Sequence, residues 1–183
     1  LLLDYPREVE LAADPQTCKG RLEEHCGGLL GMMMGDPVIQ NTVVVAGGAV
    51  TAALAGCASG DCDLFLITES ADAGMDVLKR IYDAVTRLSI SSRGADARVF
   101  VTRSAWAVTF FFAPSPAPIQ VVLSTYKSTA DLLASFDVDA AACAFQLSRD
   151  AFVCTARCRR ALEHGVNIAD STRHSRTYVH RLE

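Results

Sequence analysis

The sequence predicts an α/β (α+β) fold in which helices flank a mixed sheet of about five to seven strands. Short apolar runs rich in β-branched residues alternate with longer stretches whose apolar residues recur at helical spacing. Turns that contain glycine, proline or serine separate these segments. Half of the 183 residues are apolar, so one domain has enough material for a sizeable core.

The first element is expected to be a helix that follows an irregular N-terminus. Thr17 is its expected N-cap, and apolar residues continue at roughly helical spacing as far as Met33. Gly27 and Gly28 weaken this helix, and the turn at 35–37 is expected to end it.

The central stretch, 42–67, organises the rest of the chain. An apolar β-branched run over 42–46 predicts a buried strand, Gly47 and Gly48 open a short helix, and 61–67 predicts a second strand. Side chains alternate along a strand, so Asp61 and Asp63 point the same way. Two adjacent carboxylates are costly without a cation between them, and Mg²⁺ prefers such oxygen ligands.

The remaining elements follow from the same signals. We expect helices over 72–90, after Ser128 and over 156–164, and strands over 97–103, 106–112, 119–123, about 136–145 and 152–154. The break between 97–103 and 106–112 is too short for a crossover, so these two strands are expected to be antiparallel. Trp106 is expected in the core, and a further helix is expected near Ser175.

Charge divides the chain unevenly. Segment 149–183 holds seven arginines and four acidic residues, a balance of +3 in a chain whose net charge is −4. We therefore expect a domain over 1–148 with a basic extension over 149–183, which contacts RNA or a protein acceptor or is simply a solvated surface. The seven cysteines are irregularly spaced and the N-terminus has no basic leader, which predicts an intracellular (cytoplasmic or nuclear) protein without a membrane span.

The central stretch resembles the DNA polymerase β-like nucleotidyltransferase superfamily. The resemblance rests on a strand, the Gly47-Gly48 pair that opens a helix, and Asp61-x-Asp63 on the next strand. It implies that the glycines, with Ser59, face the triphosphate of an NTP. It also implies that Asp61 and Asp63 hold Mg²⁺ or Mn²⁺ for nucleotidyl transfer to an acceptor. Lys127 is placed in the nucleotide pocket by its position after the 119–123 strand.

The third carboxylate of that superfamily is where this sequence departs from the pattern. Gln120 stands at the expected position, and an amide is a weak metal ligand and no base. Three explanations follow: the domain binds a nucleotide or partner without catalysis, another acid serves, or the strand alignment is shifted. Asp137 and Asp139 are the next candidates, although turn chemistry also accounts for them.

Two broader alternatives stand beside this hypothesis. The glycines and acids also fit an unrelated α/β domain with structural turns. Segment 119–145 and the later Tyr178 and Arg181 resemble uncharacterised domains of protist and large-DNA-virus proteins found beside ankyrin repeats, and that resemblance implies no activity. The sequence determines neither the acceptor nor the oligomeric state.

Overall fold

A computed structural model describes residues 2–4 and 14–168 of the chain. The helices are α1 (Pro15–His25), α2 (Leu29–Met34), α3 (Pro37–Thr42), α4 (Gly48–Ala55), α5 (Ala71–Arg93), α6 (Thr129–Ser135) and α7 (Ala156–His164), with short 3₁₀ turns η1 (Asp139–Ala141) and η2 (Leu147–Arg149). The strands are β1 (Leu2–Asp4), β2 (Val43–Ala46), β3 (Cys62–Ile67), β4 (Phe100–Arg103), β5 (Ala107–Phe111), β6 (Ile119–Tyr126), β7 (Cys143–Gln146), β8 (Ala151–Cys154) and β9 (Val166–Ile168).

Seven of these strands form one mixed sheet, in the order β4-β5-β6-β3-β2-β7-β8. Only the β3–β6 pair is parallel among the described strands, and the long α5 helix and the β4–β5 hairpin lie between the two in the chain. A separate antiparallel pair joins β1 to β9. The predicted fold class, a mixed sheet flanked by helices, is therefore confirmed.

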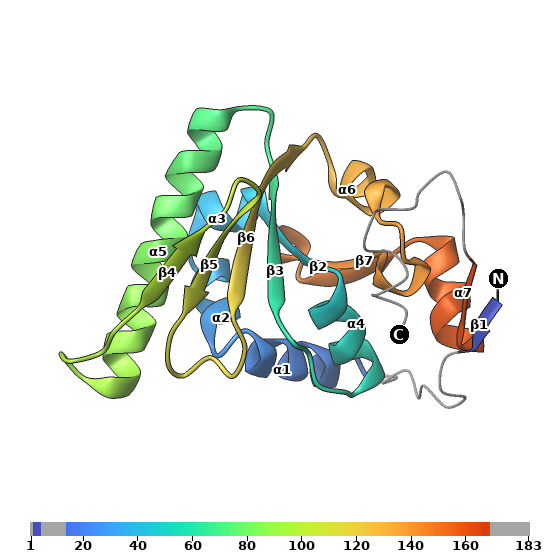
Figure 1. The fold of residues 1–183 in the computed structure, drawn as a ribbon, viewed down its shortest axis with the longest axis horizontal. Coiled ribbons are helices and arrows are strands. Elements are labelled where there is room, and N and C mark those ends of the chain that lie inside the picture. The colour runs from blue at the N-terminus through green and yellow to red at the C-terminus, as the bar shows by residue number, and fades with distance from the viewer. Residues whose placement is uncertain (1, 5–13, 169–183) are drawn as a thin grey trace.

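The two faces of the sheet are covered to different extents. Helices α1, α2, α3 and α5 pack on one face over a large apolar core, and α5 runs along the β4 side of the molecule (Figure 1). On the opposite face a smaller apolar cluster joins β2, β3 and β7 to α6, through Leu132 and Leu133. Figure 1 shows that no described helix lies in front of β4 and β5, so this part of the second face is open.

The N-terminal helices differ from the predicted single helix. Asp14, not Thr17, caps α1, because its carboxylate accepts the N–H groups of Gln16 and Thr17. Left-handed backbone at Gly28 (φ 86°) then separates α1 from α2.

The turn at 35–37 begins a helix as well as ending one. The Asp36 carboxylate accepts the N–H groups of Val38 and Ile39, and Pro37 occupies the first position of α3. An Asp-Pro pair can end one helix and begin the next, and only the helix end was predicted from the sequence.

The segment expected to be a strand over 136–145 is one only at its end. Residues 139–141 form the 3₁₀ turn η1, in which the Ala140 N–H bonds the buried Asn167 side chain at 2.8 Å, and β7 begins at Cys143. The antiparallel pairing of the β4–β5 hairpin is confirmed. Trp106, expected in the core, is 76% exposed because it lies in the turn of that hairpin.

Two further predictions concern the ends of the chain and the membrane. The helix expected near Ser175 lies outside the described residues. Among the described helices, none is both long and apolar enough to cross a bilayer.

Candidate nucleotide and metal site

The corner between β2 and α4 depends on a glycine. Gly47 is buried at φ 82°, a conformation that side chains rarely adopt, and an added Cβ would lie 3.3 Å from the Phe136 ring. Its N–H donates to the Cys143 carbonyl at 3.1 Å, which ties the corner to β7. Gly48 is exposed, and no described side chain caps the first turn of α4. The N–H groups of this turn are therefore available to an anion, as the resemblance implies.

Asp63 lies directly beside this corner. Ala46, the last residue of β2, is the cross-strand partner of Asp63 in β3. Asp61 precedes the strand and is exposed, whereas Asp63 is partly buried. The structure thus places Asp63, with the charge of Asp61 beside it, next to the strand end that leads into Gly47 and Gly48.

The carboxylate of Asp63 is left incompletely satisfied. Its Oδ1 atom is buried and has no hydrogen-bond partner among the described residues. Burial, and then the neighbouring Asp61 carboxylate, raise the pKa of Asp63 to about 7. A cation between the two acids would compensate the buried charge of Asp63 and the repulsion from Asp61.

Gln120 occupies the position at which a third carboxylate was expected. It is the register partner of Asp63 in the parallel strand β6, so the two side chains share a face. Its Nε2 donates to Thr109 Oγ1 at 3.2 Å on β5. Thr109 was not singled out from the sequence, since only the strand order places it next to Gln120.

Asp139 is engaged elsewhere. Its two carboxylate oxygens accept from Arg157 (3.1 Å) and Arg160 (2.6 Å), and one also accepts the Ile168 N–H at 3.2 Å. Asp137 is buried in the same segment. Within residues 2–4 and 14–168, no three His, Cys, Asp or Glu side chains are grouped so that they could hold a metal ion. The described structure therefore does not join Asp137 or Asp139 to Asp61 and Asp63.

The two other predicted nucleotide ligands lie at different places. The Ser59 hydroxyl donates to the Asp61 carbonyl at 2.6 Å, so it orders the turn that leads into β3. Lys127 is exposed and follows Tyr126, whose partner is Ile67 at the far end of β3. It therefore lies about six strand residues, or roughly 20 Å, from the acids.

The basic C-terminal segment is only partly described. Arg157 and Arg160 form ion pairs with Asp139, which occupies them within the fold. The segment also supplies β8 to the main sheet. The arginines at 173, 176 and 181, which were part of the expected contact with RNA or protein, lie outside the described residues.

Comparison with solved structures defines the class of fold. The chain is similar to the Thermotoga maritima CCA-adding enzyme complexed with tRNA (TM-score 0.50, 14% identity, 79% of this chain and 36% of that one). It is also similar to a CCA-adding enzyme in complex with CTP (TM-score 0.54, 16% identity, 81% and 33%) and to an apo form (TM-score 0.51, 19% identity, 86% and 34%). The chain spans about a third of these enzymes, and at such identities the likeness shows a polymerase β-like nucleotidyltransferase fold.

The family follows from a second comparison. The model of the Gabija anti-defense 2 (Gad2) family matches residues 20–164, and the chain belongs to this family. No curated protein matches the chain. The resemblance to domains found beside ankyrin repeats stays a prediction.

Proposed function

We propose that this protein is a metal-dependent nucleotidyltransferase that passes a nucleotidyl group from an NTP to an acceptor. One observation carries the proposal: the buried Oδ1 of Asp63, which has no partner in the described part of the chain, lies near Asp61 and the first turn of α4, which no described side chain caps. This juxtaposition offers carboxylate oxygens to a cation and backbone N–H groups to phosphates.

The residues present fit a divalent cation. Mg²⁺ is usually held by one or two carboxylates together with substrate phosphates and water, so Asp61 and Asp63 suffice when a nucleotide is bound. Such an ion, or Mn²⁺, would neutralise charge on the phosphates during transfer. The orphaned Asp63 oxygen supports this assignment, because it lacks a partner among the described residues.

The chain's own groups take the remaining roles. The first turn of α4 binds phosphate oxygens, and the glycines at 47 and 48 let these oxygens approach the backbone. Gln120 is oriented by its hydrogen bond to Thr109 and offers an amide to the substrate, but it cannot accept the proton of an acceptor hydroxyl.

Gln120 also favours a second candidate function. With an amide as the register partner of Asp63, the domain would bind an NTP and metal without transferring the nucleotidyl group. Membership of the Gad2 family supports an anti-defence role for either candidate. A transferase would act on the Gabija defence by modification, and a binding domain would act by sequestering a nucleotide.

Labelled NTPs with Mg²⁺ or Mn²⁺ and mixed RNA, DNA and protein acceptors test the two candidates. The wild type is compared with an Asp61→Ala/Asp63→Ala variant and with Asp83→Ala, which removes an exposed acid on α5. Transfer that the double variant loses and Asp83→Ala keeps supports nucleotidyl transfer. Metal-dependent NTP binding without transfer supports the second candidate, and the absence of both contradicts the two together.

A further inference from the structure

The open part of the sheet face carries two exposed aromatic rings. Phe111 of β5 lies on the same face as Thr109, and its register partner is Phe100 of β4. Phe100 is 65% exposed and Phe111 is 42% exposed, although phenylalanine is usually buried. The rings therefore occupy adjacent strands on the side where no described helix covers the sheet (Figure 1).

These rings continue the face that carries the acids. Asp63, Gln120 and Thr109 are register partners across β3, β6 and β5. Two residues further along β5, toward the Asp61 end of the sheet, Phe111 lies on the same face. Strands lie about 4.8 Å apart, so the Phe111 backbone is roughly 10 Å from that of β3 and Phe100 is roughly 15 Å away.

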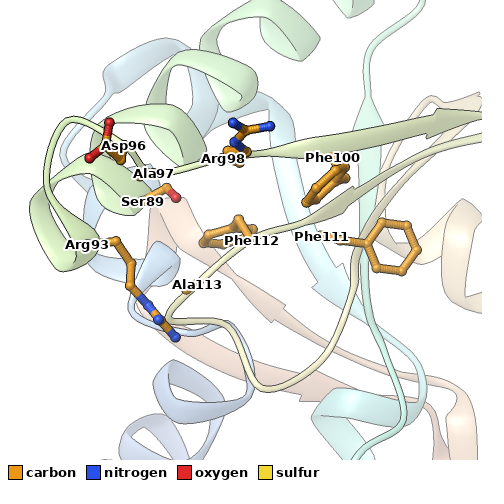
Figure 2. A pocket seen from close by; sticks show the side chains of 9 residues that line it. All are labelled: Ser89, Arg93, Asp96, Ala97, Arg98, Phe100, Phe111, Phe112 and Ala113. Atoms are coloured by element: carbon orange, nitrogen blue, oxygen red, sulfur yellow. The ribbon is translucent and has the colours of Figure 1, made fainter.

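Unpaired positive charge accompanies the rings. A groove of about 550 Å³ is lined by both rings, Arg98 and Asp96. Arg93 and Ser89 of α5 and the side chain of Phe112 also line it, so it extends from the open face to the side of the sheet that α5 covers. Figure 2 shows the two rings at one end of the groove and Arg93 at the other. Neither Arg93 nor Arg98 forms an ion pair within the described part of the chain, so the groove offers two guanidinium groups against one carboxylate.

We propose that Phe100 and Phe111 stack bases of a single-stranded nucleic acid whose phosphates contact Arg93 and Arg98. Aromatic rings beside a positively charged groove are the usual means of binding single strands without reading sequence. A double helix would hide the base faces that the rings need.

The position of the rings indicates that this strand is the acceptor, an assignment that rests on the proposed function. The uncapped start of α4 lies on the β2 side of Asp63, where the NTP phosphates are proposed to bind. Phe111 and Phe100 lie on the opposite, β6 side. Two substrates that react at the acids need separate approaches, and the sheet provides one on each side of Asp63.

Binding of short labelled oligonucleotides by fluorescence anisotropy tests the inference. The probes are a single-stranded RNA, a DNA of the same sequence and the corresponding duplexes. A Phe100→Leu/Phe111→Leu variant keeps apolar bulk and removes the rings. Val101→Leu is the matched control, because Val101 is a similarly exposed β4 residue on the other face of the sheet.

The ring-deficient variant is expected to bind single strands about tenfold more weakly or worse, since loss of base stacking has effects of this size. The control is expected to bind like the wild type. An Arg93→Gln/Arg98→Gln variant is expected to lower the salt dependence of binding, by about 0.7 in log–log slope for each phosphate that the arginines neutralise in the wild type. Comparison of the RNA and DNA probes shows which single strand the two rings bind.

Three results would overturn the inference: no binding of either single strand by the wild type, equal binding of duplexes, or undiminished binding by the Leu variant. The last result would indicate an apolar docking surface for a protein instead. Metal-dependent NTP binding is measured on the same variants and is expected to stay unchanged. If the wild type does not bind an NTP in the presence of metal, the proposed function is contradicted. If the wild type binds the NTP but neither single strand, only this inference is contradicted.

Discussion

The chain contains two Asp-x-Asp pairs, and the fold treats them in opposite ways. Asp139 is 4% exposed, and its oxygens are satisfied by two arginines and a backbone N–H. Asp63 is less deeply buried, yet one of its oxygens has no partner in the described structure, and the nearest charge identified beside it is another carboxylate. In the first arrangement the buried charge is compensated within the fold, whereas the second carries an electrostatic cost that a bound cation would relieve.

This difference teaches that the pattern itself does not identify a metal site. A carboxylate with arginine partners is part of the scaffold, whereas a buried carboxylate without partners is a candidate for function. Substitutions at Asp139, Asp63, Gln120 and Arg160 test the distinction.

The largest effect on stability is expected for Asp139→Ala. The substitution leaves Arg157 and Arg160 without their carboxylate partner, and the Arg157 side chain is only 14% exposed. Because removal of one member of a buried ion pair leaves an uncompensated charge, we expect a loss of about 3–5 kcal/mol. Urea denaturation measures the free energy of unfolding. Asp61→Ala is the comparison, since its exposed side chain predicts a change within about 0.5 kcal/mol. Equal effects of the two substitutions would remove the distinction between the pairs.

The second prediction concerns pH. The pKa of Asp63 is about 7 in the folded state and near 3.8 in an unfolded chain, so the folded state binds the proton more tightly. Stability in a chelating buffer is therefore expected to fall as pH rises from about 4 to about 7, by about 2–4 kcal/mol.

Asp63→Asn removes this titrating group and supplies the control. The variant is expected to lose most of the pH dependence and to be more stable than the wild type at pH 8, as measured by thermal denaturation. Added Mg²⁺ is expected to stabilise the wild type and not the variant. If the stability of the wild type does not change between pH 4 and 7, the raised pKa of Asp63 is contradicted.

The third prediction adds the missing acid. Gln120→Asp places a carboxylate at the register partner of Asp63, and we expect Mn²⁺ to bind about tenfold more tightly, which corresponds to about 1.4 kcal/mol. Without metal, the third like charge is expected to lower the thermal stability. Isothermal titration measures the affinity, and Thr109→Val controls for removal of the Gln120 hydrogen bond. Unchanged affinity would show that position 120 does not face the ion.

The smallest effect is expected for Arg160→Ala. Its side chain is 42% exposed and contributes one bond to Asp139, so we expect a loss of about 1 kcal/mol. Arg157→Ala is expected to cost more, because Arg157 also donates to the carbonyls of Leu133 and Phe136. Urea denaturation of the two variants compares them, and a larger loss for Arg160→Ala would reverse the assignment of the stabilising partner.

Local patterns were sufficient for the central corner. The β-branched run before Gly47, the glycine pair and the apolar run around Asp63 predict a strand, a helix and a strand, and all three form. Each of these signals acts over a few residues, through backbone preference and side-chain alternation. The same reasoning failed at 137–142, where residues 139–141 form a 3₁₀ turn and the Ala140 N–H donates to the side chain of the distant Asn167.

By itself, the sequence determined the mixed α/β class and the glycine corner beside the strand of Asp63, because these follow from short-range geometry. Only the tertiary structure decided the environment of each acid. It placed β6 beside β3, so that Gln120 became the partner of Asp63, and it delivered Arg157 and Arg160 to Asp139. These contacts join residues far apart in the chain, and local patterns carry no information about which distant side chain will neutralise a given charge.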